Sequence, residues 1–257
     1  MGLERAALAA RINESPAGDL QARYEALLSR REERVPVAYL IGTREFWSLD
    51  FHVDDRVLIP RPETEHVVEH SVRLLRDVDK PRIADIGTGA GPIAVALAHE
   101  IAGAEIDAVD LSTGALEVAR GNAERHGVAD RIHFHQGDAL GPLLEQGLSG
   151  RFDLVASNPP YVSRNEADSV QEEVRRWEPE MAVFAGERGD EVIARLIPQA
   201  AAALRRGGHL VMEISLPRLA PVRALIEADG RFDDVADYPD LAGMPRVVIA
   251  RGLGGAE

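Results

Sequence analysis

The chain has 257 residues, of which 45% are hydrophobic and none is cysteine, and its 43 acidic and 29 basic residues give a formal net charge of −14. This length accommodates one large α/β domain with a small additional module, and the lack of cysteine excludes disulfides, thiolate metal sites and a cysteine nucleophile. The acidic surplus argues against a stable nucleic-acid partner. No apolar run reaches the roughly 18 residues of a membrane span, so we expect a cytoplasmic protein that binds neither nucleic acid stably nor a membrane.

The N-terminal part predicts helices followed by extended segments. Residues 2–34 are rich in Ala and Leu with interspersed Arg and Glu, which predicts helical structure interrupted near residues 15–18. Residues 45–53 (EFWSLDFHV) alternate like a strand, the aspartates at 54 and 55 fit a turn, and residues 56–59 (RVLI) resume extended structure. A small helical and β-hairpin module is therefore expected here.

The rest of the chain predicts an α/β fold. Pro62, followed by several acidic residues, fits the first turn of a helix. Beyond it, strand-like and helix-like runs alternate, which predicts a Rossmann-like, seven-stranded and mostly parallel sheet covered on both faces. Strands are expected at 82–87, 105–111, 131–137, 152–158, 208–214, 232–238 and 246–251, and helices at 92–102, 114–127, 188–206 and 218–229, with a Gly- and Leu-containing loop before the fourth strand.

A glycine-rich loop, DIGTGAG, follows the first of these strands. The dinucleotide fingerprint GxGxxG fails here, because the sixth position counted from Gly87 is Pro92 and that counted from Gly89 is Ala94. A GxGxG loop with an acid two residues ahead is instead typical of S-adenosylmethionine sites. The expected cofactor-binding residues of this loop are Gly87, Thr88, Gly89, Ala90 and Gly91.

Two aspartates follow neighbouring strands of the predicted sheet. Asp110 ends the second strand, where its carboxylate can accept hydrogen bonds from both ribose hydroxyls of the cofactor. Asp138 ends the third strand and either accepts from the adenine amino group or caps the N-terminus of a helix, and both interpretations stay open. Ala139 is expected to meet the adenine through its backbone and methyl group. No spacing of His, Asp and Glu indicates a metal site.

The fourth strand runs into the sequence SNPPY. Asn158 offers an acceptor side-chain oxygen, and the prolines at 159 and 160 fix the direction of the carbonyls before them. Two acceptors then converge on one point, which suits a planar –NH₂ group, and the Tyr161 ring offers a surface for a flat amide or base. We expect Asn158, Pro159 and Tyr161 to be catalytic and Asn158 to adjoin the cofactor as well. The alternative is a stiff structural turn.

In this order, the segments PVAYLIGTREFWSLDFHV, LIPRPETE, DIGTGAG, AVD and SNPPYV resemble the bacterial HemK/PrmC family, S-adenosylmethionine-dependent methyltransferases of class I that modify the glutamine of the GGQ loop in peptide chain release factors. The resemblance spans about residues 20–251. It implies that Asn158 and Pro159 bind the glutamine amide, with Pro160 and Tyr161 beside it, and that the glycine loop and Asp110 bind the cofactor. It also implies a substrate-recognition module at 1–61 and a catalytic domain at 62–257.

Several features depart from the family or leave alternatives open. The N-terminal helical part is shorter than family members usually have, residues 213–217 (EISLP) replace a more usual Gly and Gln, and Ala139 replaces a bulkier residue. LIPRPETE is expected to line the substrate cleft, where Arg61 either holds substrate backbone or forms a surface ion pair with Glu63 or Glu65. The alternative targets are a glutamine in a ribosomal protein or an adenine in RNA or DNA, and the non-enzymatic alternative is a cofactor-binding assembly partner.

Overall fold

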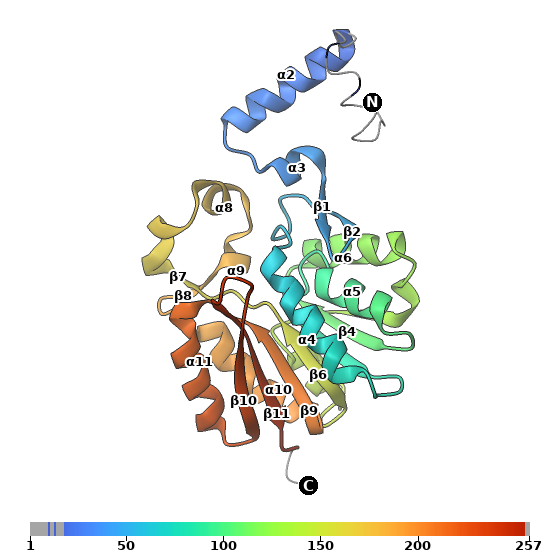
Figure 1. The fold of residues 1–257 in the computed structure, drawn as a ribbon, viewed down its shortest axis with the longest axis vertical. Helices are drawn as coiled ribbons and strands as arrows, with labels where there is room; N and C mark the ends of the chain where they lie inside the picture. Colours follow the sequence, from blue (N-terminus) through green and yellow to red (C-terminus); the bar gives the residue numbers. More distant parts are fainter. Residues whose placement is uncertain (1–9, 11–12, 14–17, 255–257) are drawn as a thin grey trace.

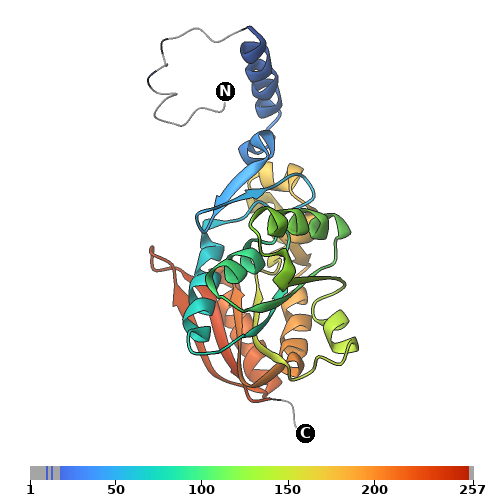
Figure 2. The same cartoon turned by 90° about the vertical axis from the view of Figure 1, so that its right-hand side faces the viewer.

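The computed structural model describes residues 10, 13 and 18–254. The predicted interruption near 15–18 lies largely outside these residues. Within them, α2 (Gly18–Glu32) is helical, as expected, and α3 (Val37–Ile41) is a further short helix outside the predicted helical range. α2 buries none of its residues and extends away from the rest of the chain (Figures 1 and 2), so no face of this helix is packed into the core.

A tight hairpin follows, with β1 (Thr43–Phe46) paired antiparallel to β2 (Leu49–His52). The expectation of one strand over residues 45–53 is wrong, because the chain turns at Trp47 and Ser48, both of which have positive φ. Such a pair of left-handed residues is typical of two-residue hairpin turns, usually with Asn or Gly. Here tertiary contacts stabilise the turn without Asn or Gly. The Trp47 backbone N–H donates to Glu65 Oε1 (2.8 Å), and its indole N–H donates to Glu100 Oε1 (2.9 Å). Residues 56–59, expected to be extended, form no strand.

The hairpin packs against the rest of the chain through two aromatic rings and one amide. Phe46 and Phe51 meet edge to face with ring centres 5.9 Å apart, and both belong to a buried cluster that continues into the sheet. The fully buried Asn122 of α6 (Thr113–Arg125) accepts from His52 N (2.8 Å) and donates to His52 O (3.0 Å) and Ala90 O (2.8 Å). One side chain thus joins the hairpin to the loop after β3.

The central sheet has seven strands in the order β10-β11-β9-β6-β3-β4-β5. Its strands are β3 (Arg82–Ile86), β4 (Glu105–Asp110), β5 (Ile132–Gln136), β6 (Phe152–Ser157), β9 (Leu204–Glu213), β10 (Phe232–Pro239) and β11 (Pro245–Gly252). β11 runs antiparallel to both of its neighbours and the other pairings are parallel. The predicted seven-stranded, mostly parallel sheet is confirmed, and its carboxyl-end crevice lies where β3 meets β4 and β6.

Helices cover both faces of this sheet (Figure 1). On one face lie α4 (Glu65–Leu75), preceded by the short η1 (Pro62–Thr64), α5 (Pro92–Glu100) and α6. On the other lie α10 (Glu191–Ala203), α11 (Leu216–Asp229) and the short α7 (Gly141–Glu145), which occupies part of the segment expected to be a loop. None of the helices within the described residues is long and apolar enough to cross a membrane.

Alternation along the strands divides the core into two layers. Ile83 faces the α4, α5 and α6 side, whereas Ala84 and Ile86 face the α7, α10 and α11 side. This period of two is the geometry of a pleated strand. Each fully buried Ile or Leu contributes roughly 1.5–3 kcal/mol of transfer free energy, so the two aliphatic layers hold the strand ends in fixed positions.

An ordered segment connects β6 to α10. It contains β7 (Val162–Ser163), which pairs with β8 (Phe184–Gly186), the 3-10 helix η3 (Arg164–Ser169), and the helices α8 (Glu172–Trp177) and α9 (Glu180–Val183). Another 3-10 helix, η2 (Ala129–Arg131), lies elsewhere, between α6 and β5. Arg218 of α11 donates from Nε to the Tyr161 carbonyl (3.0 Å). The family resemblance also implies an ordered lid over residues 178–193 (EPEMAVFAGERGDEVI), and in the structure this segment lies beside the carboxyl ends of the strands (Figure 1).

Candidate active site

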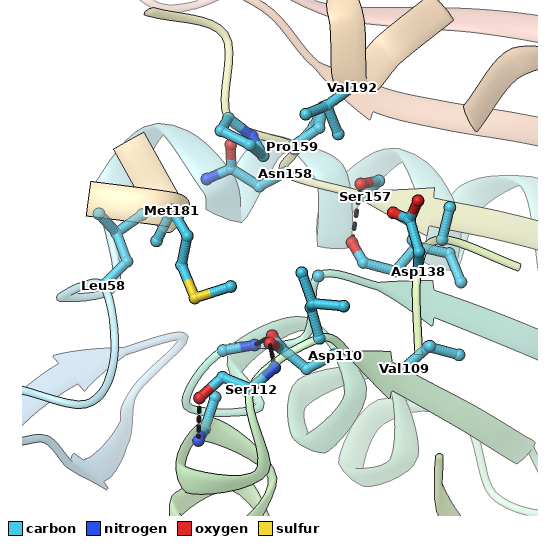
Figure 3. A pocket seen from close by; sticks show the side chains of 18 of the residues that line it. Leu58, Val109, Asp110, Ser112, Asp138, Ser157, Asn158, Pro159, Met181 and Val192 are labelled. Atoms are coloured by element: carbon cyan, nitrogen blue, oxygen red, sulfur yellow. Dashed lines mark hydrogen bonds between the residues drawn. The ribbon is translucent and has the colours of Figure 1, made fainter. Parts of the chain in front are cut away.

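A cavity of about 300 Å³ lies at the carboxyl ends of β3, β4, β5 and β6 (Figure 3). The segments that enclose it include the glycine loop, the loops after β4 and β5, the SNPPY segment, residues 56–58, the lid helix α9 and part of α10. The expected site residues that line it are Gly87, Gly89, Asp110, Asp138, Ala139, Asn158, Pro159 and Pro160. The fold therefore brings residues from Gly87 to Pro160 together at one edge of the sheet, as expected for residues that follow the ends of parallel strands.

The glycine loop turns sharply because its three glycines have φ values of 72°, 56° and 83°. At Gly89 the turn aims the backbone N–H at Asp110 Oδ2 (2.9 Å). At Gly91 a side chain would also be crowded, because a Cβ there would lie 3.2 Å from Ala119 Cβ. Gly91 therefore brings α5 close to α6 and lines neither this cavity nor the smaller one beside it.

Asp85 lies behind the loop and is fully buried. Its Oδ2 accepts from the Thr88 hydroxyl (2.6 Å) and from Ala94 N (3.1 Å), whereas its Oδ1 is buried without a hydrogen-bond partner. Burial raises the pKa of Asp85 to about 7, although both hydrogen bonds oppose the shift. The Asp85 carboxyl therefore fixes the loop and carries a proton at mildly acidic pH.

Asp110 presents a partly satisfied carboxylate to the cavity. Oδ1 accepts from Ser112 N (2.9 Å) and Oδ2 from Gly89 N (2.9 Å). A carboxylate has about four acceptor sites, so each oxygen retains one for a ligand. Burial raises the pKa of Asp110 above its usual value, while the backbone N–H groups of Ser112, Gly89 and Leu111 lower it. The geometry suits a ligand with two neighbouring hydroxyl groups.

Asp138 and Ala139 line the same cavity from the loop after β5. The alternative of a helix N-cap is not realised, because α7 begins after Leu140 and has no side-chain cap. The Asp138 carboxylate instead lies 3.3 Å from Arg195 Nε of α10. Ala139 has a φ of 50°, an unusual left-handed conformation for a residue with a Cβ. Two acidic groups thus face the cavity from different strand ends, as Figure 3 shows.

Asn158 is held at the end of β6 by the residues around it. Ser157 donates its hydroxyl to the Ile86 carbonyl (2.7 Å), which joins the ends of β6 and β3. Asn158 Nδ2 donates to Thr64 Oγ1 (2.9 Å). This contact leaves the acceptor oxygen of Asn158 without an intramolecular partner among the described residues, next to the prolines that line the cavity. The arrangement offers acceptors to a donor entering from outside.

Tyr161 does not line either cavity. Its hydroxyl donates to Glu213 Oε1 (3.3 Å), and burial raises its pKa above the usual value. The Tyr161 ring packs against the cluster on the α7, α10 and α11 side. Its predicted role as a surface for a flat amide therefore stays a prediction.

Arg61 lies in a smaller cavity of about 40 Å³ next to the main one, together with Leu58, Thr64, Thr88 and Asn158. The alternative of a surface ion pair with Glu63 or Glu65 is not realised. Arg61 Nη2 instead lies 2.6 Å from Oε1 of Glu178, a buried lid residue whose Oε2 accepts from Ile59 N (3.0 Å). The ion pair thus joins the LIPRPETE segment to the lid.

Several lining residues were missed by sequence reasoning. Leu58 and Thr64 lie within LIPRPETE, so that segment already indicated them as a group. Met181 of α9 extends its thioether into the cavity, and only its place in the lid segment pointed toward the site (Figure 3). The other missed residues include Val109, Ser112, Val192 and Leu196, which carry no local signal because they are ordinary aliphatic or polar residues.

The residues of the cavity fit S-adenosylmethionine. Asp110 retains acceptors for the two ribose hydroxyls, the glycine loop offers close backbone approach, and aliphatic side chains form walls for a flat base. No group of three or more His, Cys, Asp or Glu side chains that could hold a metal occurs within the described part of the chain. A seven-stranded sheet of this order with this loop and acid defines a class I S-adenosylmethionine-dependent methyltransferase.

The comparisons with known proteins narrow this class. The family model of the methyltransferase small domain matches residues 68–176, and that of the PrmC N-terminal domain matches residues 1–42. The release factor glutamine methyltransferase of Koribacter versatilis is 42% identical over 91% of this chain and 80% of its own length. That of Deinococcus radiodurans is 41% identical over 99% of this chain and 88% of its own length. The chain belongs to the release factor glutamine methyltransferase family.

Solved structures support the fold. The hMettl16 catalytic domain, in complex with MAT2A 3'UTR hairpin 6, matches with a TM-score of 0.63 at 18% identity, over 83% of this chain and 80% of that one. An S-adenosylmethionine-dependent O-methyltransferase from Thermotoga maritima matches with a TM-score of 0.51 at 12% identity, over 79% and 68%. At these identities the likeness concerns the architecture alone, so it does not indicate a nucleic-acid substrate here.

Proposed function

We propose that this protein transfers a methyl group from S-adenosylmethionine to the side-chain amide nitrogen of the glutamine in the GGQ motif of peptide chain release factors. The observation that carries the proposal is the position of Asn158, with its oxygen unpaired among the described residues, in the same cavity as Asp110 and the glycine loop. Membership of the release factor glutamine methyltransferase family supports this substrate.

The acidic groups and apolar walls of the larger cavity support its assignment as the cofactor site. Asp110 holds the ribose, Asp138 and Ala139 adjoin the adenine, and residues 87–90 contact the cofactor along the backbone. When bound, S-adenosylmethionine supplies an electrophilic methyl group on a sulfonium. Gly91 contributes through helix packing, since it lines neither cavity.

Asn158 and Pro159 position the substrate nitrogen. An amide nitrogen is planar and weakly nucleophilic, so the protein must hold it in line with the methyl group and stabilise the positive charge that develops on it. The Asn158 Oδ1 and the Pro159 carbonyl accept the two amide hydrogens, and Pro160 stiffens the segment. No strong base is needed before transfer, because the nitrogen becomes acidic only after it is alkylated.

The release factor enters from the side of residues 1–61, which we propose as a recognition module, while residues 62–257 form the catalytic domain. LIPRPETE supports this path, because Leu58 and Thr64 adjoin Asn158 in the smaller cavity. Arg61 is tied to Glu178, so it contacts substrate backbone only through its remaining N–H groups. A substrate that acts in translation termination places the enzyme in the cytoplasm.

The test is mass spectrometry of the GGQ peptide of a purified release factor after incubation with the protein and S-adenosylmethionine. We expect a gain of one methyl group on the glutamine. Asn158→Ala should lower kcat by about 100-fold or more, because it removes an alignment contact, while cofactor affinity measured by calorimetry stays near that of the wild type.

The matched control is Asn165→Ala, an exposed residue of η3 that lines neither cavity. Equal losses of methyl transfer and cofactor binding in Asn158→Ala would refute its assigned role. Methylation of a ribosomal protein or of adenine, with the release factor unmodified, would refute the proposed substrate. Cofactor binding without transfer to any of these would indicate an assembly partner.

A further inference from the structure

A buried carboxyl group lies behind Asn158 and has no part in the proposed reaction so far. Glu213 is the last residue of β9, is 2% exposed and lines neither cavity. Its Oε2 accepts from the Thr64 hydroxyl (2.5 Å), and its Oε1 accepts from the Tyr161 hydroxyl (3.3 Å). Burying a carboxyl costs free energy unless it is hydrogen-bonded, and these two contacts give each Glu213 oxygen a partner.

Three hydrogen bonds connect these residues: Asn158 donates to Thr64, and Thr64 and Tyr161 both donate to Glu213. A hydroxyl group has one hydrogen to donate. Because Thr64 donates its hydrogen to Glu213, it can only accept from Asn158, and the group it accepts from must be the Asn158 NH₂. The Asn158 oxygen is then turned away from Thr64. Reversal of the Thr64 hydroxyl would instead favour the flipped amide, with its NH₂ toward the substrate.

We propose that Glu213 is a positioning residue that acts through Thr64 to hold the Asn158 amide in the orientation in which its oxygen accepts from the substrate amide. This inference rests on the proposed function, because it matters only if Asn158 grips an –NH₂ group. An oxygen at that position attracts the substrate, whereas an NH₂ group would face the substrate NH₂ with two donors and no acceptor.

The charge on Glu213 should control this orientation. An ionised carboxylate accepts from both hydroxyls, whereas a protonated one must donate through one oxygen and can reverse the Thr64 hydroxyl. The charged groups that act on Glu213 are Glu63, beside Thr64, which raises its pKa, and Arg246 of β11, which lowers it. Burial is the largest influence, and the pKa of Glu213 is raised to about 7.

The first test removes the Thr64 hydroxyl. Thr64→Val is nearly isosteric and leaves Asn158 free to flip, so single-turnover methyl transfer at saturating cofactor should fall by about 10- to 100-fold. Thr64→Ser keeps the hydroxyl and should retain most of the rate. Cofactor affinity should stay unchanged in both variants.

A double-mutant cycle separates positioning from a general structural effect. In the Asn158→Ala background, Thr64→Val should change the residual rate by less than about twofold, because Thr64 acts only through Asn158. An equal loss in both backgrounds would overturn the proposal. So would a Thr64→Val rate equal to that of the wild type when Asn158→Ala is strongly impaired.

The second test is the pH profile. In the wild type the single-turnover rate should fall about tenfold from pH 8 to pH 6, because the ionised fraction of a group with a pKa of about 7 falls by that factor. Glu213→Gln can accept from Thr64 and donate to Tyr161 at every pH, so its rate should stay high and lose this fall. The variant retains Asp85, the other buried carboxyl with a pKa of about 7, and thereby separates the two.

The outcomes distinguish this inference from the function on which it rests. If the wild type does not methylate the release factor, the proposed function fails. If Asn158→Ala is impaired but the Glu213→Gln profile keeps the acid limb of the wild type, only the positioning role of Glu213 fails. The pH test needs no folded Thr64→Val protein, so a folding defect in that variant leaves the inference open to refutation.

Discussion

Replacement of Asp110 is the most direct test of the cofactor assignment. Asp110→Ala removes both oxygens that would accept from the ribose hydroxyls, and it also leaves the Gly89 and Ser112 N–H groups without their acceptor. Loss of hydrogen bonds to a charged group of this kind costs about 1.5–3 kcal/mol. We therefore expect the dissociation constant of S-adenosylmethionine to rise by roughly 10- to 150-fold.

Isothermal titration calorimetry at pH 8 measures this change directly. The matched control is Asp130→Ala, which removes the same charge from an exposed residue that lines neither cavity. Thermal unfolding of both variants should confirm that the fold persists. An affinity of Asp110→Ala within about twofold of the wild type, in a folded protein, would refute the ribose assignment, because no charge-assisted hydrogen bond would then have been lost.

Three further predictions concern stability and the lid. Gly91→Ala should lower the free energy of unfolding by about 1–2 kcal/mol, because its φ of 83° is left-handed and its Cβ would crowd Ala119, whereas Gly121→Ala, in α6 with open space around it, should stabilise by up to about 1 kcal/mol in the same urea titration. The raised pKa of Asp85 means that the native state holds the Asp85 proton between about pH 4 and pH 7, while the unfolded state does not. The stability of the wild type should therefore decline as pH rises through that window. Asp85→Asn should show a shallower decline in urea titrations at successive pH values. Glu178→Ala should speed limited proteolysis within residues 164–190, because it frees Arg61 and the Ile59 amide from the lid. Cleavage as slow as that of the wild type would contradict the role of the Arg61–Glu178 ion pair in holding the lid.

The fold was largely predictable because the strand-and-helix alternation of residues 82–251 follows burial on both faces of the sheet. Strand ends were predictable for the same reason, so the sequence alone predicts Asp110, Asp138 and Asn158 at one edge of the sheet. The hairpin turn was not, because Trp47 and Ser48 have no local preference for a positive φ and depend on Glu65 and Glu100.

The site was predictable only where a residue carries its own chemistry. Val192 and Leu196 line the cavity because α10 passes behind it, and no local pattern distinguishes them from other core residues of that helix. The alternative of a Glu63 or Glu65 partner for Arg61 is not realised, because the acids nearest to it in sequence are not the nearest in space. Long-range pairs of this kind follow from the path of the lid.

The contacts of Asn122 set a condition for anyone who exchanges the entrance of this enzyme for that of a relative. Its side-chain amide hydrogen-bonds both the N–H and the carbonyl of His52, as a neighbouring strand would. It also donates to the Ala90 carbonyl in the glycine loop. A transplanted hairpin would therefore have to present its backbone to the same amide. If it did not, the graft would disturb the cofactor loop directly, and a chimera designed to change only the protein substrate would also bind its methyl donor less tightly.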